Sequence, residues 1–194
     1  MKFKELKSTM ITIRPFKISD IINITKILND EIGENYYSEN DLHLFISNQN
    51  YIGYVACFDS QIIGFGISNI DTISQIIDIT IADELKSFFK YTQTIGWIKT
   101  IAINKLFQKR GIGSLICKAM MRDFYEKKVE AIIVTAWKIG NNVNSDKMLN
   151  LFGIKMICEI SEYWKNDSTI KNYNCTICGN PPCLCTSVIY GKIL

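Results

Sequence analysis

The sequence of 194 residues predicts an α/β protein with a mixed sheet and helices on both faces. Three observations support this fold class. Strands in the first half of the chain sit in hairpins, strands between residues 97 and 137 flank a helix, and residues 131–137 are nearly all apolar. A strand that is apolar on both sides is typical of a sheet covered by helices on each face. A chain of this length can bury one substantial core, so we expect residues 1–194 to form a single domain.

The first half predicts a strand, a helix and a hairpin. Residues 11–16 alternate as a strand, and Ser19 occupies the position of a helix N-cap. Residues 21–32 then place apolar side chains on one helical face, and a short helix is expected around residues 42–46. Residues 54–67 predict a hairpin with a tight turn.

Residues 69–94 allow two interpretations. The isoleucines from position 76 to 81 would continue a strand, whereas residues 83–91 would form one or two helical turns. The pattern does not choose between them.

The second half predicts strands that alternate with helices. An apolar strand at residues 97–103 precedes a helix that begins at Ile112, and residues 131–137 form the next strand. The remaining expected elements are a short helix within residues 142–152, a strand at 154–160, a polar connector at 162–174 and a strand at 188–190.

A glycine-rich turn opens the helix that follows the apolar strand. The segment Gln108-Lys109-Arg110-Gly111-Ile112-Gly113 places two glycines and two cations at the helix start. Backbone N–H groups at a helix N-terminus favour anions, and glycine lets the chain aim several of them at one phosphate. Taken alone, such a turn is more often a plain helix start than a phosphate site.

The surrounding segment decides between these explanations. No G-x-x-x-x-G-K-S/T phosphate loop occurs, and a dinucleotide G-x-G-x-x-G motif fails at Ile116. Residues 101–115 instead resemble the signature of the GNAT superfamily of N-acetyltransferases, in which an apolar strand and a short loop precede Gln/Arg-x-x-Gly-x-Gly/Ala at a helix start. Arg14-Pro15, the central hairpin, and Asn142 eleven residues before Gly153 match further landmarks of the family.

The resemblance covers about residues 10–160 and implies both fold and activity. The expected fold is of the α+β type, with a mixed, mostly antiparallel sheet flanked by helices on both faces. The expected reaction is direct attack of a primary amine on the thioester of acetyl-CoA.

The resemblance also implies which residues bind acetyl-CoA. Amides of the glycine-rich turn would hold the pyrophosphate, the preceding strand would bond the pantetheine arm, and Asn142 would contact the coenzyme beyond the next strand. The expected cofactor-binding residues are Ile101, Ala102, Ile103, Gln108, Lys109, Arg110, Gly111, Ile112, Gly113, Ser114 and Asn142.

The proton transfers are not assigned by the resemblance. Many family members carry a tyrosine four residues before the glycine matched by Gly153, as the acid for the departing thiolate, and this chain has Leu149 there. Tyr163 is a candidate substitute, although an ordinary structural tyrosine is the commoner explanation. Glu31 and Glu34 follow the first helix, where the family builds acceptor contacts, and are candidate bases, although most such carboxylates are merely solvated. The sequence therefore assigns no catalytic residue.

Four cysteines lie close together near position 180: Cys175, Cys178, Cys183 and Cys185. C-x-x-C-G is the usual shape of a zinc knuckle, because a gap of two residues lets both thiolates reach one ion. We call residues 172–187 the cysteine loop and expect the four thiolates to hold a zinc ion. With four protein ligands the site would be structural and not catalytic. An iron–sulfur cluster and free thiols are the alternatives.

Composition limits the partners that we expect. The net charge is only +3 and few cations lie near the cysteine loop, so no nucleic-acid partner is expected. No apolar run approaches the roughly 20 residues of a membrane helix, and the charged N-terminus lacks the pattern of a signal peptide. We expect a cytoplasmic protein without a membrane partner, either a monomer or a homodimer.

Two functional hypotheses follow. The leading one is an acetyl-CoA-dependent N-acetyltransferase that modifies a small-molecule amine or a protein amine. The alternative is a coenzyme A-binding sensor or interaction protein with weak or no catalysis and a structural zinc site. The missing tyrosine at position 149 keeps the alternative open.

Overall fold

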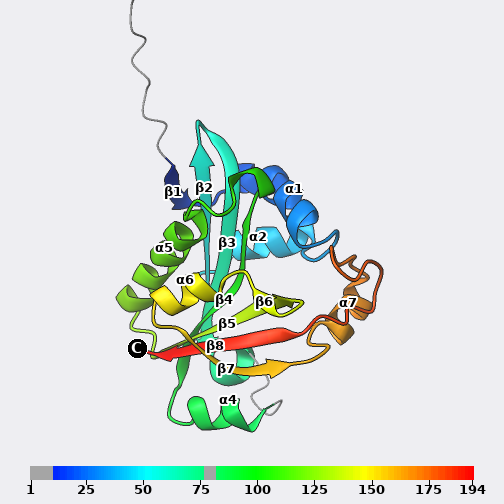
Figure 1. Cartoon of the computed structure of the whole chain (residues 1–194). Coiled ribbons are helices and arrows are strands. Elements are labelled where there is room, and N and C mark those ends of the chain that lie inside the picture. Colours follow the sequence, from blue (N-terminus) through cyan, green and yellow to red (C-terminus); the bar gives the residue numbers. More distant parts are fainter. Residues whose placement is uncertain (1–10, 77–81) are drawn as a thin grey trace, which may run out of the picture.

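A computed structural model describes residues 11–76 and 82–194, which form one eight-stranded sheet with helices around it (Figure 1). The strands are β1 (Thr12–Pro15), β2 (Tyr51–Phe58), β3 (Gln61–Thr72), β4 (Thr94–Ile103), β5 (Ala131–Ile139), β6 (Asn142–Val143), β7 (Lys155–Ile160) and β8 (Ser187–Ile193). The helices are α1 (Ile21–Glu31), α2 (Glu39–Ser47), α3 (Ile73–Ile76), α4 (Asp83–Phe88), α5 (Ile112–Glu126), α6 (Asp146–Leu151) and α7 (Lys165–Lys171).

The sheet confirms the expected fold class. Its strands lie in the order β1-β2-β3-β4-β5-β8-β7, and the short β6 pairs with β5. Within the described residues β4 and β5 pair in parallel, and the other neighbouring strands are antiparallel. The result is the mixed, mostly antiparallel sheet that the resemblance implies.

Helices cover both faces of the sheet (Figure 1). On one face, which we call the α5 face, Ile116, Met120 and Phe124 of α5 pack with Leu149 of α6 against inward-facing strand residues. On the other face, the α1/α2 face, the apolar sides of α1, α2 and α4 are buried. No helix within residues 11–76 and 82–194 is long and apolar enough to cross a bilayer.

In the segment with two interpretations, Ile76 lies in helix α3 and not in a strand, and the helical turns predicted from residue 83 are present as α4. β3 runs to Thr72 and is followed at once by α3, and α4 begins at Asp83. The isoleucines at positions 77, 79 and 81 lie outside the described residues. The predicted polar connector contains a further helix, α7.

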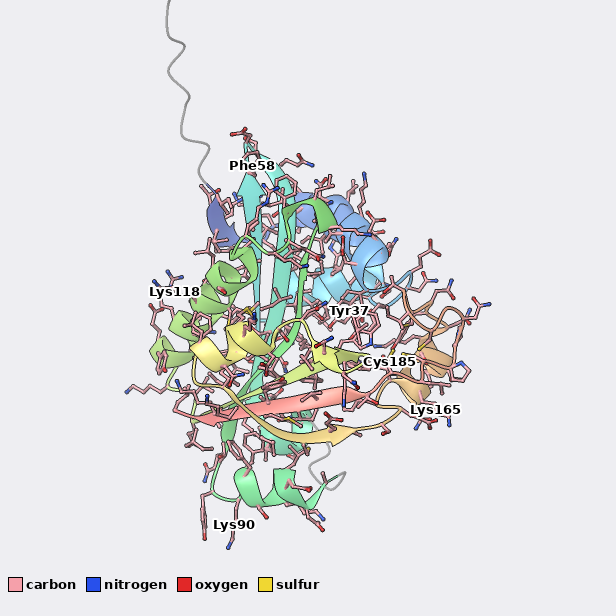
Figure 2. The ribbon with its side chains drawn as sticks, viewed as in Figure 1. Tyr37, Phe58, Lys90, Lys118, Lys165 and Cys185 are labelled. Atoms are coloured by element: carbon pink, nitrogen blue, oxygen red, sulfur yellow. The ribbon has the colours of Figure 1, made fainter. Side chains whose placement is uncertain are left out.

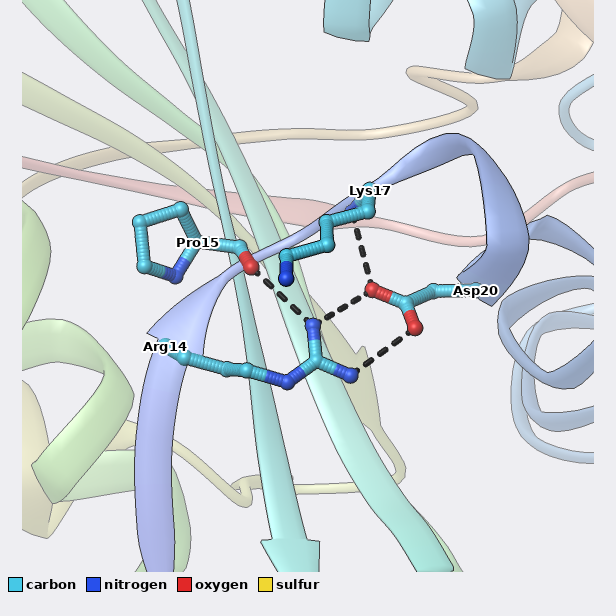
Figure 3. Close-up of polar contacts among 4 residues, drawn as sticks. All are labelled: Arg14, Pro15, Lys17 and Asp20. Carbon is cyan, nitrogen blue, oxygen red and sulfur yellow. Dashed lines mark hydrogen bonds and ion pairs between the residues drawn. The ribbon is translucent and has the colours of Figure 1, made fainter.

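The start of α1 differs from the prediction. Ser19 is not the N-cap; instead Ile18–Asp20 forms a 3₁₀ turn that leads into the helix. The buried carboxylate of Asp20 accepts hydrogen bonds from the Lys17 backbone N–H at 2.8 Å and from both Arg14 nitrogens at 2.6 and 2.9 Å (Figure 3). The bonds from Arg14 hold the pKa of Asp20 below its usual range. This ion pair fixes β1 to the beginning of α1.

The sheet opens between β4 and β5. Their parallel pairing covers Ile95–Ile98 against Ala131–Val134 and goes no further. Beyond these pairs β4 stays on β3 as far as Ile103, while β5 stays on β8 as far as Trp137. The carboxyl ends of the two strands therefore diverge and leave main-chain groups of β4 without a partner strand on that side.

Candidate functional site

The N-terminus of α5 lies at the open end of the sheet. Gly113, in the first turn of α5, lies over Ile101 of β4, since a Cβ added at Gly113 would be 3.8 Å from Ile101 Cγ2. The segment 104–111 joins the two elements through a 3₁₀ turn at Lys105–Phe107. A strand edge with free main-chain groups and a helix N-terminus are thus neighbours.

Gly111 gives this helix start its form. Its φ is +78°, a conformation that other residues adopt only with strain, and it is the N-cap of α5. No side chain caps the helix, so the N–H groups of Ile112, Gly113 and Ser114 keep their capacity to bind an anion. Nothing lies within 4 Å of the point where a Gly111 Cβ would be, so the approach to these groups is open.

The loop before α5 is held by Glu31, at the end of α1. The Glu31 carboxylate accepts hydrogen bonds from the Lys105 backbone N–H at 2.7 Å and from Gln108 Nε2 at 2.9 Å. Gln108 Nε2 also donates to the carbonyl of Ile103 at 2.9 Å. With its carboxylate engaged in this way, Glu31 holds the loop in position.

The remaining predicted cofactor residues surround the same end of the sheet. Lys109 and Arg110 are exposed beside Gly111. Ala102 faces α1 and α2, whereas Ile101 and Ile103 contribute to the α5 face. Asn142 is exposed at the start of β6, where it pairs with Ile139 of β5.

A β-bulge lies where β4 and β5 separate. The register of β4 on β3 shifts between Ile67 and Ser68, whose partners are Thr100 and Ile98, so Lys99 is the extra residue. Bulges often occur next to active sites, because they re-aim a side chain and leave an unpaired main-chain group. The sequence gives one sign that this position is unusual: a lysine lies within an apolar strand.

The Lys99 side chain lies among aromatic rings on the α1/α2 face. Its Nζ is 4.2 Å from the ring centroid of Trp97 and 6.0 Å from that of Tyr51. It has no ion-pair partner within 4.0 Å in the described part of the chain. Burial, reinforced by the charge of Lys171, lowers the pKa of Lys99 to about 8.

The α1/α2 face at this point also carries the loop between α1 and α2. The hydroxyls of Tyr37 and Thr100 share a hydrogen bond of 3.0 Å that joins this loop to β4. Trp97 Nε1 donates to Thr135 Oγ1 at 3.3 Å and so spans from β4 to β5. Glu34 is exposed, and its carboxylate makes no hydrogen bond among the described residues, so it stays a candidate base on position alone.

The two residues considered for thiolate protonation have different surroundings. Leu149 is fully buried in the apolar cluster beneath α5, so this chain uses the position for packing. Tyr163 packs with the apolar cluster that α4 forms with the neighbouring strands. It also packs against Trp164, with ring centroids 4.9 Å apart. Burial raises the pKa of Tyr163, so its hydroxyl keeps its proton near neutral pH. These contacts do not bring Tyr163 to the N-terminus of α5.

The cysteine loop gathers its four sulfur atoms around one point. All four lie within 4.8 Å of one another, and Cys185 Sγ is 3.8 Å from Cys175 Sγ and 3.3 Å from Cys178 Sγ. Tetrahedral zinc with Zn–S bonds of about 2.3 Å would separate its sulfurs by about 3.8 Å. The backbone N–H groups of Ile177 and Cys178 both point at Cys175 Sγ at 3.4 Å, an arrangement that stabilises a thiolate ligand. The donor set therefore fits one tetrahedral ion.

A family comparison agrees with this geometry. Residues 21–153 match the model of the acetyltransferase (GNAT) family, which is more than half of the chain. The chain belongs to the GNAT family. A search among curated proteins finds no significant match.

Solved GNAT structures share the fold over nearly the whole chain. An Arabidopsis thaliana NAA60 in complex with acetyl-CoA is 14% identical, with a TM-score of 0.70 over 95% of this chain and 99% of that one. A ribosomal-protein-alanine N-acetyltransferase from Brucella melitensis is 14% identical, with a TM-score of 0.64 over 94% and 99% of the two chains. A Drosophila melanogaster polyamine N-acetyltransferase is 10% identical, with a TM-score of 0.62 over 95% and 100%. At these identities the likeness concerns the fold.

Proposed function

We propose that this GNAT protein transfers the acetyl group of acetyl-CoA to a primary amine of a small molecule or a protein. The observation that carries the proposal is the divergence of β4 and β5 beside an uncapped α5 N-terminus. This arrangement offers amides for a pyrophosphate and a free strand edge for an amide-containing arm. Membership of the GNAT family supports the same reading.

The proposed acetyl-CoA site follows from these positions. The amides of Gly111, Ile112, Gly113 and Ser114 would bind the pyrophosphate, with Lys109 and Arg110 adding positive charge at the rim. The edge of β4 at residues 101–103 would bond the pantetheine arm, and Asn142 would contact it from the other side of the opening. Gln108 would act indirectly, by holding the loop through Glu31.

The chemistry requires a proton acceptor near the attacking amine. The amine nitrogen forms a bond to the acetyl carbon, the C–S bond breaks, and the amine proton must leave. We infer that neutral Lys99 accepts this proton, because it lies at the bulge where the strands part and its pKa is about 8. The sulfur leaves as a thiolate, and an unpaired strand N–H of β4 would stabilise the tetrahedral oxyanion.

We also propose that the cysteine loop binds one zinc ion as a structural site. Four thiolates complete a tetrahedron and leave no open position for a reacting ligand. Their mutual separations suit a single ion, which supports zinc over a cluster of several iron atoms. Elemental analysis of the purified protein would show one zinc per chain; absence of metal would contradict the assignment.

Calorimetry with acetyl-CoA tests the coenzyme site. Gly111→Asp places a carboxylate and an unfavourable φ at the centre of the amide cluster, so affinity should fall by at least about 100-fold. Asn172→Asp is a matched control, since Asn172 also has a positive φ, is exposed, and lies at the end of α7. Equal affinity in Gly111→Asp and the native protein would refute the phosphate assignment.

Release of free coenzyme A thiol tests catalysis. Acetyl-CoA is incubated with a panel of small primary amines and peptides with free α-amino or lysine groups, and thiol release above the hydrolysis rate is measured. Turnover with any class identifies the acceptor. Tight acetyl-CoA binding with no turnover across the panel would favour the coenzyme A-binding sensor.

A further inference from the structure

The cysteine loop pairs with the loop between α1 and α2. We call residues 32–37 the α1–α2 loop. The backbone N–H of Thr176 donates to the Ile32 carbonyl at 3.1 Å, and the N–H of Asn174 donates to the Glu34 carbonyl at 3.0 Å. Both bonds are donated by the cysteine loop to alternate carbonyls of the α1–α2 loop. The two loops are far apart in the sequence, but these two bonds hold them side by side.

Gly33 allows the backbones to touch. A Cβ at this position would lie 1.8 Å from the carbonyl oxygen of Asn174, a distance that no side chain can occupy. The pairing therefore depends on glycine at position 33.

Aromatic contacts continue from the cysteine loop to β4. Tyr173 is buried with its ring centroid 5.0 Å from that of Tyr36, and Tyr36 is 4.7 Å from Tyr37. The Tyr37 hydroxyl then bonds Thr100, the neighbour of Lys99. Figure 2 shows the labelled Tyr37 and Cys185 on the same side of the molecule, between α2 and α7. The position of the cysteine loop is thereby connected to the bulge at which the amine would react.

The cysteine loop has only a small buried cluster of its own. Its buried cluster consists of Tyr173 and three of the cysteines, and the aliphatic side chains Ile177 and Leu184 are more than half exposed. Thiolates gathered without an ion repel one another, whereas a bound ion draws them together. For such a segment the free energy of metal binding is also its free energy of folding.

We propose that the ion bound by the cysteine loop fixes the α1–α2 loop in place and thereby sets the affinity for the amine acceptor. The acetyl-CoA site should not respond, because the loop before α5 is held by Glu31 from α1, and the apolar side of α1 packs against β2, β3 and β4. The inference rests on the acetyltransferase function proposed above. Its test needs neither an acceptor nor turnover.

Hydrogen exchange followed by mass spectrometry on the full chain tests the connection. Zinc-loaded protein is compared with chelator-treated protein and with Cys178→Ser, which removes the most exposed of the four thiols. Loss of zinc should raise exchange about tenfold or more in residues 172–187 and also in 32–37, while residues 104–116 stay unchanged. The acetyl-CoA dissociation constant, measured by calorimetry, should stay within about twofold.

Two variants distinguish the effect of zinc binding from that of the backbone contact between the cysteine loop and the α1–α2 loop. Cys158→Ser removes a cysteine of β7 outside the cysteine loop and should leave zinc content and exchange as in the native protein. Gly33→Ala should retain zinc yet raise exchange in residues 32–37, because the added Cβ pushes Asn174 away.

The proposal is overturned if residues 32–37 exchange equally with and without zinc, or if the chain binds no zinc. It is also overturned if zinc loss raises exchange throughout the chain and abolishes acetyl-CoA binding, since the ion would then support the whole fold. Failure of the zinc-loaded chain to bind acetyl-CoA refutes the proposed transferase instead, and the exchange pattern still decides the role of the ion.

Discussion

Lys99 is the residue whose surroundings are least like those of an ordinary surface lysine. It lies at the β4 bulge beside Trp97, and burial lowers its pKa to about 8. Charged groups on two packed elements act on it: Lys171 and Asp167 of α7, and Asp41 of α2. An amine with this pKa can accept a proton from an ammonium-derived intermediate near neutral pH.

Lys99→Arg should lower kcat by about 100-fold, because arginine keeps the positive charge but cannot accept a proton. The acetyl-CoA dissociation constant should not change. Native Lys99 is protonated below its pKa, so the native rate should rise with pH through about 8. Steady-state rates measured between about pH 6 and 10 should show this rise in the native enzyme and not in the variant. A variant whose rate equals the native rate and rises with pH in the same way would exclude Lys99 as the base.

Sequence reasoning reaches some of these residues and not others. Gly111 is predictable, because a glycine between a strand and a helix has a local signature. The environment of Lys99 is not, since it depends on a shift in the register of β4 on β3 that involves residues more than 30 positions away. Likewise, Glu31 is tied to the α5 loop by contacts that no local pattern records.

Among the elements, the α1–α2 loop is joined to β4 by the buried hydrogen bond between Tyr37 and Thr100. Tyr37→Phe should reduce the free energy of unfolding by about 1–2 kcal/mol, because it leaves the Thr100 hydroxyl without its partner. Tyr37→Phe combined with Thr100→Val should recover part of this loss, since both polar groups are then removed. Urea denaturation measures both values, with the exposed Tyr91→Phe as the control. Strictly additive losses would show that the hydrogen bond contributes nothing.

The junction of β1 and α1 gives a second prediction at this scale. Asp20→Asn should reduce the free energy of unfolding by about 2 kcal/mol at neutral pH, through the loss of charge-assisted bonds from Arg14. The folded-state pKa of Asp20 is lowered, so its contribution is present above the ordinary aspartate pKa of about 4 and is lost as pH falls through the lower folded value.

Urea denaturation at neutral pH and at about pH 3 should therefore show a difference from the native protein that shrinks at the lower pH. The control is Asp59→Asn, at an exposed turn position of positive φ. A difference that is constant with pH would mean that the Asp20 charge does not contribute.

Elements with a strong local pattern were predictable, and those fixed by distant contacts were not. α5 and β5 lie where periodicity places them, because their apolar residues have no other way to be buried. α7 was missed, since its sequence Lys-Asn-Asp-Ser-Thr-Ile-Lys has no apolar face and the helix is anchored by Ser168, whose hydroxyl accepts from the Cys183 N–H. Ser19 failed as an N-cap because Asp20 and Arg14 form a stronger arrangement.

At the scale of the whole molecule, the sheet consists of two halves, β1 to β4 and β5-β8-β7, which meet over a short boundary. The parallel pairing of β4 and β5 comprises four residue pairs. A ligand that bridges the diverging strands should therefore stabilise the entire chain and not only the site. At about 100 times its dissociation constant, acetyl-CoA would add about 2.7 kcal/mol and raise Tm by roughly 5–10 °C.

Differential scanning calorimetry with and without acetyl-CoA measures this shift. Gly111→Asp should lose most of it at the same ligand concentration, whereas Asn172→Asp should keep it. A native protein with no shift, despite saturation confirmed by calorimetric titration, would show that the ligand does not bind the folded chain in preference to the unfolded one.

The position of β8 has a consequence for the order of assembly. β7 precedes β8 in sequence but lies outside it, so β7 can join the sheet only through β8, whose partners on β5 lie 50 to 62 positions earlier in the chain. Until β8 docks, the apolar edge of β5 stays open and can pair with another chain. The segment that carries the cysteines joins β7 to β8, and an early ion there would shorten the connection that must close. Refolding yield at high protein concentration should therefore depend on the metal present during folding.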